Sequence, residues 1–206
     1  MKILAISHFT FCLPEEFKSF GKDIFGNGTE INVQNHVNKK IFMEGEDPTH
    51  YLYWNKNGIE VTSYLNTRFN SPDGRDLAYK FLATYASAPY QINMCYSSEF
   101  VSFLKEFGRL EKIGNNGFLL KGAGVFKDFK ILSDCTNPFS KPNQYLDEPG
   151  LSAIAVYIDS VAESIQFGNA LGEIKTKPYE VCLGDKKFQV QFVKIGGVNI
   201  ELLSRS

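Results

Sequence analysis

Two glutamates lie at positions where burial of a charged side chain would cost free energy. Glu201 interrupts the apolar run 198–203, and Glu60 lies between Ile59 and Val61 directly after a turn. A carboxylate in a half-buried strand needs water, a cation or a metal ion to stabilise its charge. The alternative is that both side chains face solvent, which the in–out alternation of a strand permits. The same acid in the same setting near both ends of the chain is the first indication of a shared site.

Other residues with chemical potential form no recognisable catalytic group. Of the three histidines, His8 lies in an apolar stretch, whereas His36 and His50 lie in or near polar, less regular stretches. A single strand histidine is commonly a hydrogen-bonded core or surface residue. No Ser-His-Asp or Cys-His arrangement for nucleophilic catalysis can be assembled. The Gly-rich pieces 115–124 and 194–199 lack the strand–turn–helix context of a phosphate-binding loop.

The last part of the chain predicts the order strand, helix, strand, strand, strand. An apolar run is followed by Asp159-Ser160, which can cap a helix with apolar residues at helical spacing. The following segments alternate or end in turn glycines, of which Gly196-Gly197 joins the last two strands. The predicted strands are 151–158, 178–183, 187–193 and 198–203, and the predicted helix begins at Val161.

The first part of the chain predicts the same order. A strand leads into Pro14, which opens a helix with Phe17, Phe20 and Ile24 at helical spacing. The predicted strands are 3–13, 30–37, a third at 41–44 or 51–54, and 59–65. Two βαβββ units in one chain predict an internal repeat.

The middle of the chain is less regular. It predicts a helix after Pro72, a strand at 90–96 and a second helix with a Phe-rich stripe that ends at Gly108. Strands at 118–121 and 125–132 and a loop at 134–150 follow. The middle is therefore either a degenerate third unit or a cover for one sheet edge. We divide the chain into a first unit at 1–65, a middle segment at 66–149 and a last unit at 150–206.

The chain resembles the vicinal oxygen chelate superfamily, which includes glyoxalase I, extradiol dioxygenases, methylmalonyl-CoA epimerase and the bleomycin- and fosfomycin-resistance proteins. LSAIAVYIDSVAESIQFGNALGEI and GGVNIELLS carry the resemblance in the last unit. ISHFTFCLPEEFKSFGKDIFG and NGIEVTSYL carry it more weakly in the first. The resemblance implies an α+β fold in which paired βαβββ units curl mixed sheets around a cleft. We expect the first unit to pair with the last; pairing of the middle with the last is the rival.

The resemblance also implies a site. In metal-dependent members, each unit supplies one ligand from its first strand and one from its last. These positions are His8 and Glu60 in the first unit, and Ala153 and Glu201 in the last. The expected ligands of a divalent metal ion are therefore His8, Glu60 and Glu201, with Glu201 also expected to be catalytic. Such an ion binds two adjacent substrate oxygens and polarises them.

Two departures from the superfamily pattern affect this expectation. Ala153 cannot bind a metal, so at most three of four ligands are present. Glu201 is the fourth residue after Gly197, whereas Glu60 is the second after Gly58 and Thr62 is the fourth. A two-residue offset keeps the same sheet face but moves a side chain about 7 Å along the strand.

Three functions stay open at this point. The first is a glyoxalase- or dioxygenase-like metal-dependent lyase, isomerase or dioxygenase acting on a small molecule with vicinal oxygens. The second is a metal-free protein of the bleomycin-resistance type that binds or sequesters a small molecule. The third is a scaffold or partner-binding module that kept only the fold. The aromatic residues expected to line the cleft, by alternation with polar neighbours, are Phe42, Tyr53, Phe188 and Phe192.

The charge composition argues against some classes of binding partner. The 22 Lys and Arg nearly balance the 23 Asp and Glu, which removes the electrostatic case for nucleic acid or an anionic membrane. No apolar stretch approaches the length of a membrane span. The four cysteines are widely spaced without a CxxC pair, so we expect free buried thiols and a cytoplasmic location. Assembly into a homo-oligomer stays open.

Overall fold

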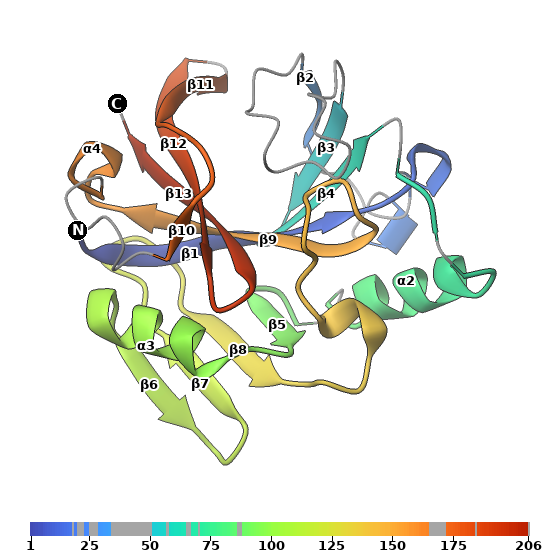
Figure 1. Ribbon diagram of the computed structural model, residues 1–206, viewed down its shortest axis with the longest axis horizontal. Helices are drawn as coiled ribbons and strands as arrows, with labels where there is room; N and C mark the ends of the chain where they lie inside the picture. The colour runs from blue at the N-terminus through green and yellow to red at the C-terminus, as the bar shows by residue number, and fades with distance from the viewer. Residues whose placement is uncertain are drawn as a thin grey trace.

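The computed structural model has mixed α+β architecture, which confirms the predicted fold class. It describes the chain except residues 18, 20–22, 25–28, 34–50, 57, 65–66, 70, 86–87, 165–171, 184 and 206. The strands form two sheets, seen in Figure 1 as a large upper sheet and a small lower one. The large sheet has the order β10-β12-β13-β9-β1-β4-β3-β2, with β11 also paired to β12, and the small one has the order β5-β8-β7-β6.

The two ends of the chain build the large sheet. The N-terminal elements are β1 (Ile3–Cys12), η1 (Glu15–Phe17), β2 (Thr29–Val33), β3 (Tyr51–Lys56) and β4 (Ile59–Tyr64). The C-terminal elements are β9 (Gly150–Ile158), α4 (Val161–Ser164), β10 (Glu173–Ile174), β11 (Tyr179–Leu183), β12 (Lys186–Ile195) and β13 (Val198–Arg205). In each end the first strand pairs in parallel with the last, β1 with β4 and β9 with β13.

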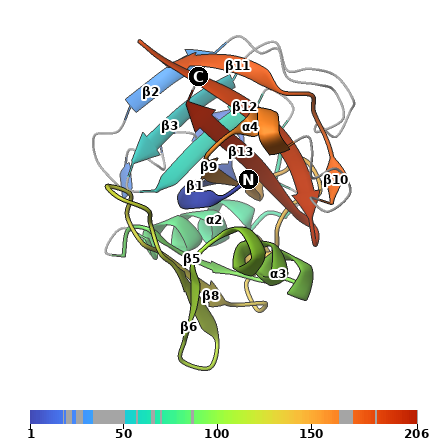
Figure 2. The same cartoon turned by 90° about the vertical axis from the view of Figure 1, so that its left-hand side faces the viewer.

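The junction of the two ends is the antiparallel pair β1–β9. The expectation that the first unit pairs with the last is therefore confirmed. The sheet is curved on either side of this junction. Strands β2 to β4 on one side and β11 to β13 on the other both bend upward from β1 and β9 (Figures 1 and 2). The middle of the chain lies on the opposite side, below β1 and β9.

The middle segment contains a β-α-β-β-β stretch, with one helix before it and a short 3-10 helix after it. Its elements are α2 (Gly74–Ala83), β5 (Gln91–Met94), α3 (Ser98–Phe107), β6 (Leu110–Ile113), β7 (Gly117–Leu120), β8 (Phe129–Ser133) and η3 (Pro138–Ser140). Strand β5 pairs in parallel with β8, while β6, β7 and β8 are antiparallel, so β5–α3–β6–β7–β8 is a full β-α-β-β-β stretch. We call this stretch the middle unit. The domain boundaries inferred from the sequence stay a prediction.

Two strand predictions in the middle were wrong. Strand β6 was missed, because Glu111 and Lys112 break the apolar signal of a four-residue strand. The strand expected from Val125 begins only at Phe129, and Val125 lies in a loop with 94% of its surface exposed. The predicted helix after Pro72 and the Phe-rich helix ending at Gly108 are confirmed as α2 and α3.

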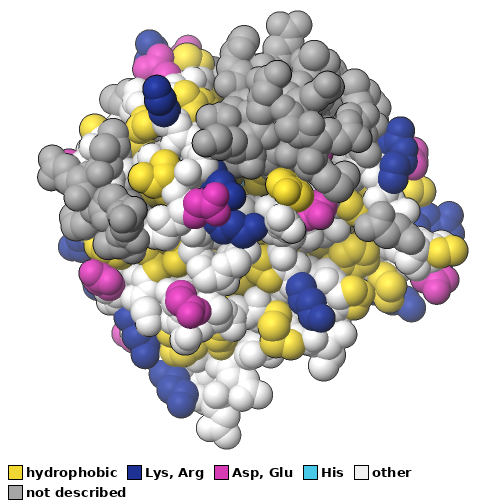
Figure 3. Space-filling model, viewed as in Figure 1, with side chains coloured by type: hydrophobic (Ala, Val, Ile, Leu, Met, Phe, Trp, Pro, Cys, Tyr) yellow, Lys and Arg dark blue, Asp and Glu magenta, His cyan; other side chains and the backbone are white. Residues whose placement is uncertain are grey.

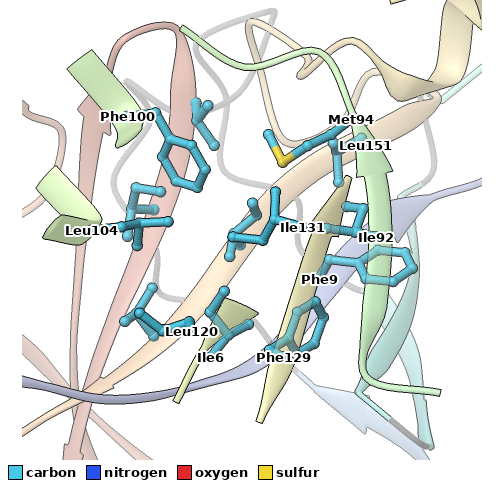
Figure 4. Packing of buried hydrophobic residues seen from close by; sticks show 14 of the residues in the cluster. Ile6, Phe9, Ile92, Met94, Phe100, Leu104, Leu120, Phe129, Ile131 and Leu151 are labelled. Carbon is cyan, nitrogen blue, oxygen red and sulfur yellow. The ribbon is translucent and has the colours of Figure 1, made fainter. Parts of the chain in front are cut away.

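The main core lies between the two sheets. Figure 4 shows Phe100 and Leu104 of α3 and Ile131 of β8 packed with Ile6 and Phe9 of β1. Ser97 caps α3 by accepting a hydrogen bond from the Phe100 amide, and the helix then buries its apolar stripe against the large sheet. The large sheet thus has a lower face on the middle unit and an upper face that points away from it.

The cysteines differ from expectation. Cys95 and Cys135 form a disulfide that joins the end of β5 to the residues after β8, so the prediction of free thiols at these two positions was wrong. Cys12 is a buried thiol, and its burial raises its pKa to about 12. Disulfides are typical of oxidising compartments. The cytoplasmic location therefore stays a prediction, against which this bond weighs.

The surface is mixed in charge. Figure 3 shows Lys and Arg side chains interspersed with Asp and Glu and with scattered apolar groups on one face, as the balanced composition predicts. Within the described ranges, no helix has both the length and the apolar character needed to cross a membrane.

Candidate metal centre

Strand alternation brings the candidate residues to the upper face of the large sheet. Ile59 and Val61, which flank Glu60, belong to the core below the sheet. Ile200 and Leu202 flank Glu201 in the same way. Because neighbouring residues in a strand point to opposite faces, both carboxylates point to the upper face.

His8 lies between the two acids. Its Nε2 atom is 3.4 Å from Oε2 of Glu60 and 3.9 Å from Oε2 of Glu201. The three side chains are 9%, 17% and 19% exposed, in the order His8, Glu60, Glu201. Strands β1, β4 and β13, which are widely separated in sequence, therefore bring all three predicted ligands together.

A β-bulge orients the imidazole. Ile6 pairs with Val156 and His8 with Ala155, so Ser7 is an extra residue without a partner on β9. Bulges commonly redirect a side chain next to a site. Ser7 Oγ lies 3.0 Å from Nδ1 of His8. This hydrogen bond fixes the ring and leaves Nε2 facing the carboxylates.

Nε2 of His8 is buried and has no hydrogen-bond partner. A buried polar atom without a partner is uncommon and costs about 1–3 kcal/mol. A bound cation is one group that satisfies a neutral imidazole nitrogen in this position. The unpartnered nitrogen is therefore the strongest indication of a ligand in the structure.

Thr10 supports Glu60. Its Oγ1 donates a hydrogen bond of 3.1 Å to Oε1 of Glu60, while Oε2 of the same carboxylate faces His8. Such outer hydrogen bonds orient ligand carboxylates in metal sites. The sequence prediction missed Thr10, although its position two residues after His8 places it on the same face.

Burial dominates the electrostatics of the site. Desolvation lowers the pKa of His8, and the charge of Glu60 offsets this in part, so the imidazole is neutral. Burial, followed by repulsion from Glu60, raises the pKa of Glu201 to about 8. In the described part of the chain, neither carboxylate has an ion pair with Lys or Arg. A cation between the acids would reverse the raised pKa of Glu201.

The strand register resolves the two-residue offset of Glu60. Thr10 pairs with Glu60 across β1 and β4, and Ala155 pairs with Glu201 across β9 and β13. Phe9–Ile59 and Ile154–Ile200 are likewise paired. Glu60 therefore corresponds to Glu201, and Thr62 lies further along β4. The offset arises because the turn of the β12–β13 hairpin lies two residues further from its glutamate than the turn of the β3–β4 hairpin does.

The same correspondence makes Ala153 the counterpart of His8 in the last unit. Phe9 pairs with Ile154 at the centre of the β1–β9 junction, and Thr10 pairs with Ala153 as Ala155 does with His8. The first strand of the last unit thus presents a methyl group where the first unit presents an imidazole. Ala153 therefore lies at the position that corresponds to His8 and has no group that can bind a metal.

The other candidates have mixed outcomes. Phe192 pairs with Glu201 across β12 and β13 and shares its face. Phe188 lies four residues before Phe192 on β12, on the same face. Both are buried in a cluster with Ala153 and Ala155 rather than exposed. Phe42, His36 and His50 lie outside the described residues, and of Tyr53 only its place in β3, paired with Thr62, is described.

The donor set fits a divalent ion, although the side chains do not form a complete shell. No group of three or more His, Cys, Asp or Glu in the described ranges is arranged to hold a metal as it stands. Two atoms that each bind one ion at about 2.0–2.2 Å lie no more than about 4.4 Å apart. Both imidazole–carboxylate distances meet this limit. The site is compatible with a metal that draws the carboxylates inward.

No protein-family model matches the sequence, and no curated protein matches it. Similar solved structures exist. The integron cassette protein VCH_CASS1 from V. cholerae has 13% identity and a TM-score of 0.39, over 56% of this chain and 92% of its own. Methylmalonyl-CoA epimerase from Mycobacterium tuberculosis has 12% identity and a TM-score of 0.36, over 99% of this chain and 89% of its own.

A third similar structure is 2,2',3-trihydroxybiphenyl 1,2-dioxygenase from Sphingomonas wittichii. It has 9% identity and a TM-score of 0.27, over 98% of this chain and 91% of its own. At these identities and TM-scores, the similarity to these structures carries no argument about the family or the activity of this chain.

Proposed function

We propose that the protein binds a divalent metal ion between His8, Glu60 and Glu201 and acts on a small molecule with two adjacent oxygens. The reaction class is that of a lyase, isomerase or dioxygenase. The observation that carries the proposal is the buried Nε2 of His8, which has no hydrogen-bond partner and faces both carboxylates.

Electrostatics supports a cation. Two carboxylates and a neutral imidazole share a largely buried space without a described Lys or Arg to balance them. Without a cation, one carboxyl must take up a proton, and Glu201 with its pKa raised to about 8 is that group. A divalent ion supplies the missing positive charge and displaces the proton.

Each residue has a role in this proposal. Neutral His8 and the charged carboxylate of Glu60 hold the ion, with Ser7 and Thr10 orienting them. A bound ion supplies Lewis-acid polarisation of the substrate oxygens. Glu201 is the proposed catalytic residue, because its carboxylate lies next to the proposed ion position, beside His8 Nε2, and a carboxylate there can take up a proton from a bound substrate.

The register supports a further part of the proposal, that the two ends of the chain are copies of one unit. Thr10–Glu60 and Ala155–Glu201 are corresponding pairs in parallel strands. One residue of each unit therefore reaches the same site from symmetrical positions. An assembly of several copies of the chain stays a prediction.

Elemental analysis after purification without chelator tests the proposal. Wild type should retain close to one equivalent of a divalent metal, and Glu201→Gln should retain much less, because the amide has similar shape but lacks the charge. Glu111→Gln is the matched control, since Glu111 is an exposed strand carboxylate that pairs with Lys121. Equal metal content in wild type and Glu201→Gln rejects the site.

A metal-free small-molecule binding protein is the second candidate. It is favoured by Ala153 at the fourth ligand position and by the apolar cluster of Phe188, Phe192 and Leu203 near it. Thermal-shift screening with aromatic and 2-oxo acid compounds, with and without chelator, separates the two. Stabilisation that is indifferent to chelator supports the second candidate, and stabilisation only with metal supports the first.

A further inference from the structure

We infer that the middle unit sets the positions of Glu60 and Glu201 by holding the turns of the two hairpins that carry them. This inference rests on the proposed function, because it concerns how two of the three proposed ligands, Glu60 and Glu201, are placed. The residues that make the contacts are Gly58 and Gly196 in the hairpins, Ser97 in the middle unit and Tyr90 directly before it.

The first contact lies under Glu60. Gly58 has φ +80°, and a Cβ atom there would lie 2.9 Å from Cδ1 of Tyr90 and 3.2 Å from Cε2 of Phe129. Its carbonyl also accepts a hydrogen bond from the Phe9 amide on β1. The turn is therefore seated on the beginnings of β5 and β8, two residues from the acid.

The second contact lies at the other hairpin. Gly196 has φ +55°, and a Cβ atom there would overlap Oγ of Ser97 and lie 3.0 Å from the Phe100 nitrogen. Ser97 is the residue that caps α3. The β12–β13 turn therefore rests on the N-terminus of α3, five residues before Glu201.

Both contacts are made by one cross-linked body. Strands β5 and β8 are parallel neighbours, and the disulfide Cys95–Cys135 joins them at the far end from Tyr90 and Phe129. Cys95 is two residues before Ser97, so the same bond restrains the α3 N-terminus. A rigid support under two separate turns fixes the separation of the acids on the strands that leave those turns.

Backbone strain marks the first contact. Tyr90 is the described non-glycine residue with positive φ, at 57°. A bulky residue in this region costs on the order of 1–3 kcal/mol and persists only where its surroundings require it. Here the conformation places the ring directly against Gly58, while the Tyr90 carbonyl accepts a hydrogen bond from the Lys130 amide.

The chain provides matched controls for a steric test. Gly197 is in the same turn as Gly196, has φ +85° and has no atom within 4 Å of a built Cβ. Gly124 has φ +62° and is equally open. Alanine at either control position introduces the same left-handed strain without a contact to the middle unit, so the comparison isolates the contact.

The experiment measures metal affinity by titration with Co²⁺ and unfolding by urea for Gly58→Ala, Gly196→Ala, Gly197→Ala and Gly124→Ala. We expect Gly58→Ala to weaken binding by about 10- to 100-fold, the range for groups that position ligands. Gly196→Ala should have a smaller effect, since its acid is more distant. The controls should lose only stability. Affinities of Gly58→Ala and Gly124→Ala that agree overturn the inference.

Tyr90→Gly covers the case in which Gly58→Ala does not fold. Glycine relieves the positive φ and removes the ring under Gly58, so metal affinity should fall although the local strain is gone. An unchanged affinity contradicts the inference.

Hydrogen exchange of the metal-free protein separates this inference from the proposed function. Amides of β4 and β13 should exchange faster in Gly58→Ala, Gly196→Ala and Tyr90→Gly than in the two control variants. If wild type binds no metal, the proposed function fails, and the exchange comparison still decides the inference. Equal exchange in contact and control variants overturns it.

Discussion

Glu60 and Glu201 occupy corresponding positions in the two halves of one sheet. Each is flanked by core residues, each lies in a strand parallel to the first strand of its half, and each lies within 4 Å of Nε2 of His8. The halves differ at the position of the histidine, where the C-terminal half has Ala153 instead. The strand positions of the two halves therefore correspond, whereas the side chains at those positions differ.

Thr10→Val should weaken metal binding. The substitution keeps the β-branched shape but removes the hydrogen bond from Oγ1 to Oε1 of Glu60, so the carboxylate is free to rotate away from His8. The expected loss is about 10- to 100-fold in affinity, with about 1 kcal/mol lost from the free energy of unfolding. Titration with Co²⁺ and urea unfolding measure the two effects. Thr84→Val, which removes an exposed hydroxyl bonded to the Lys80 carbonyl, is the control and should leave affinity unchanged.

Ala153→His should tighten metal binding by at least about tenfold, because it supplies the imidazole that the last unit lacks. Ala153 is buried, so the larger side chain should cost about 1–3 kcal/mol of stability. Ala153→Leu adds comparable bulk without a ligand and serves as the control. Isothermal titration calorimetry measures the affinities. If histidine and leucine have the same effect on affinity, the position does not face the metal.

Removal of the disulfide should destabilise the middle unit. Cys95 and Cys135 are separated by 40 residues, and a cross-link over a loop of that length stabilises by about 4 kcal/mol in the chain-entropy model. Cys95→Ser with Cys135→Ser should therefore lower the free energy of unfolding by up to that amount, as measured in urea. Cys182→Ser, at an exposed free thiol, should have little effect. Similar stability of the two variants would show that the bond does not contribute.

The sequence predicted the parts of the site that rest on local pattern. Glu60 and Glu201 were recognised because each interrupts an apolar strand, and the repeated element order suggested one shared cleft for both. His8 was selected through the resemblance, which implies a ligand on the first strand of each unit. Their convergence depends on the β1–β9 pairing, which the repeated element order correctly predicted.

Features that depend on tertiary contacts were not predictable in the same way. The bulge at Ser7 has no signature in a strand-like pattern, and Thr10 looks like any in-facing threonine until Glu60 lies beside it. Cys95 and Cys135 are distant in sequence and become neighbours only because β5 pairs with β8. Strand β6 was hidden because two of its four residues are charged.

Stability of the metal-free protein should fall as pH rises from about 6.5 to about 8.5. The pKa of Glu201 is raised to about 8 by burial and by Glu60, above its value in the unfolded chain. The folded state therefore binds more protons than the unfolded state in this window, so the free energy of unfolding decreases with pH. Glu201→Gln has no titrating carboxyl at this position and should show a flatter profile. Saturation with a divalent ion should remove this slope in wild type, because the metal-bound carboxylate is ionised throughout the window, as it is in the unfolded chain. Urea unfolding across the pH range, with chelator and with Co²⁺, measures both slopes. Parallel profiles for wild type and Glu201→Gln in chelator would show that Glu201 ionises in the folded protein as it does in the unfolded chain.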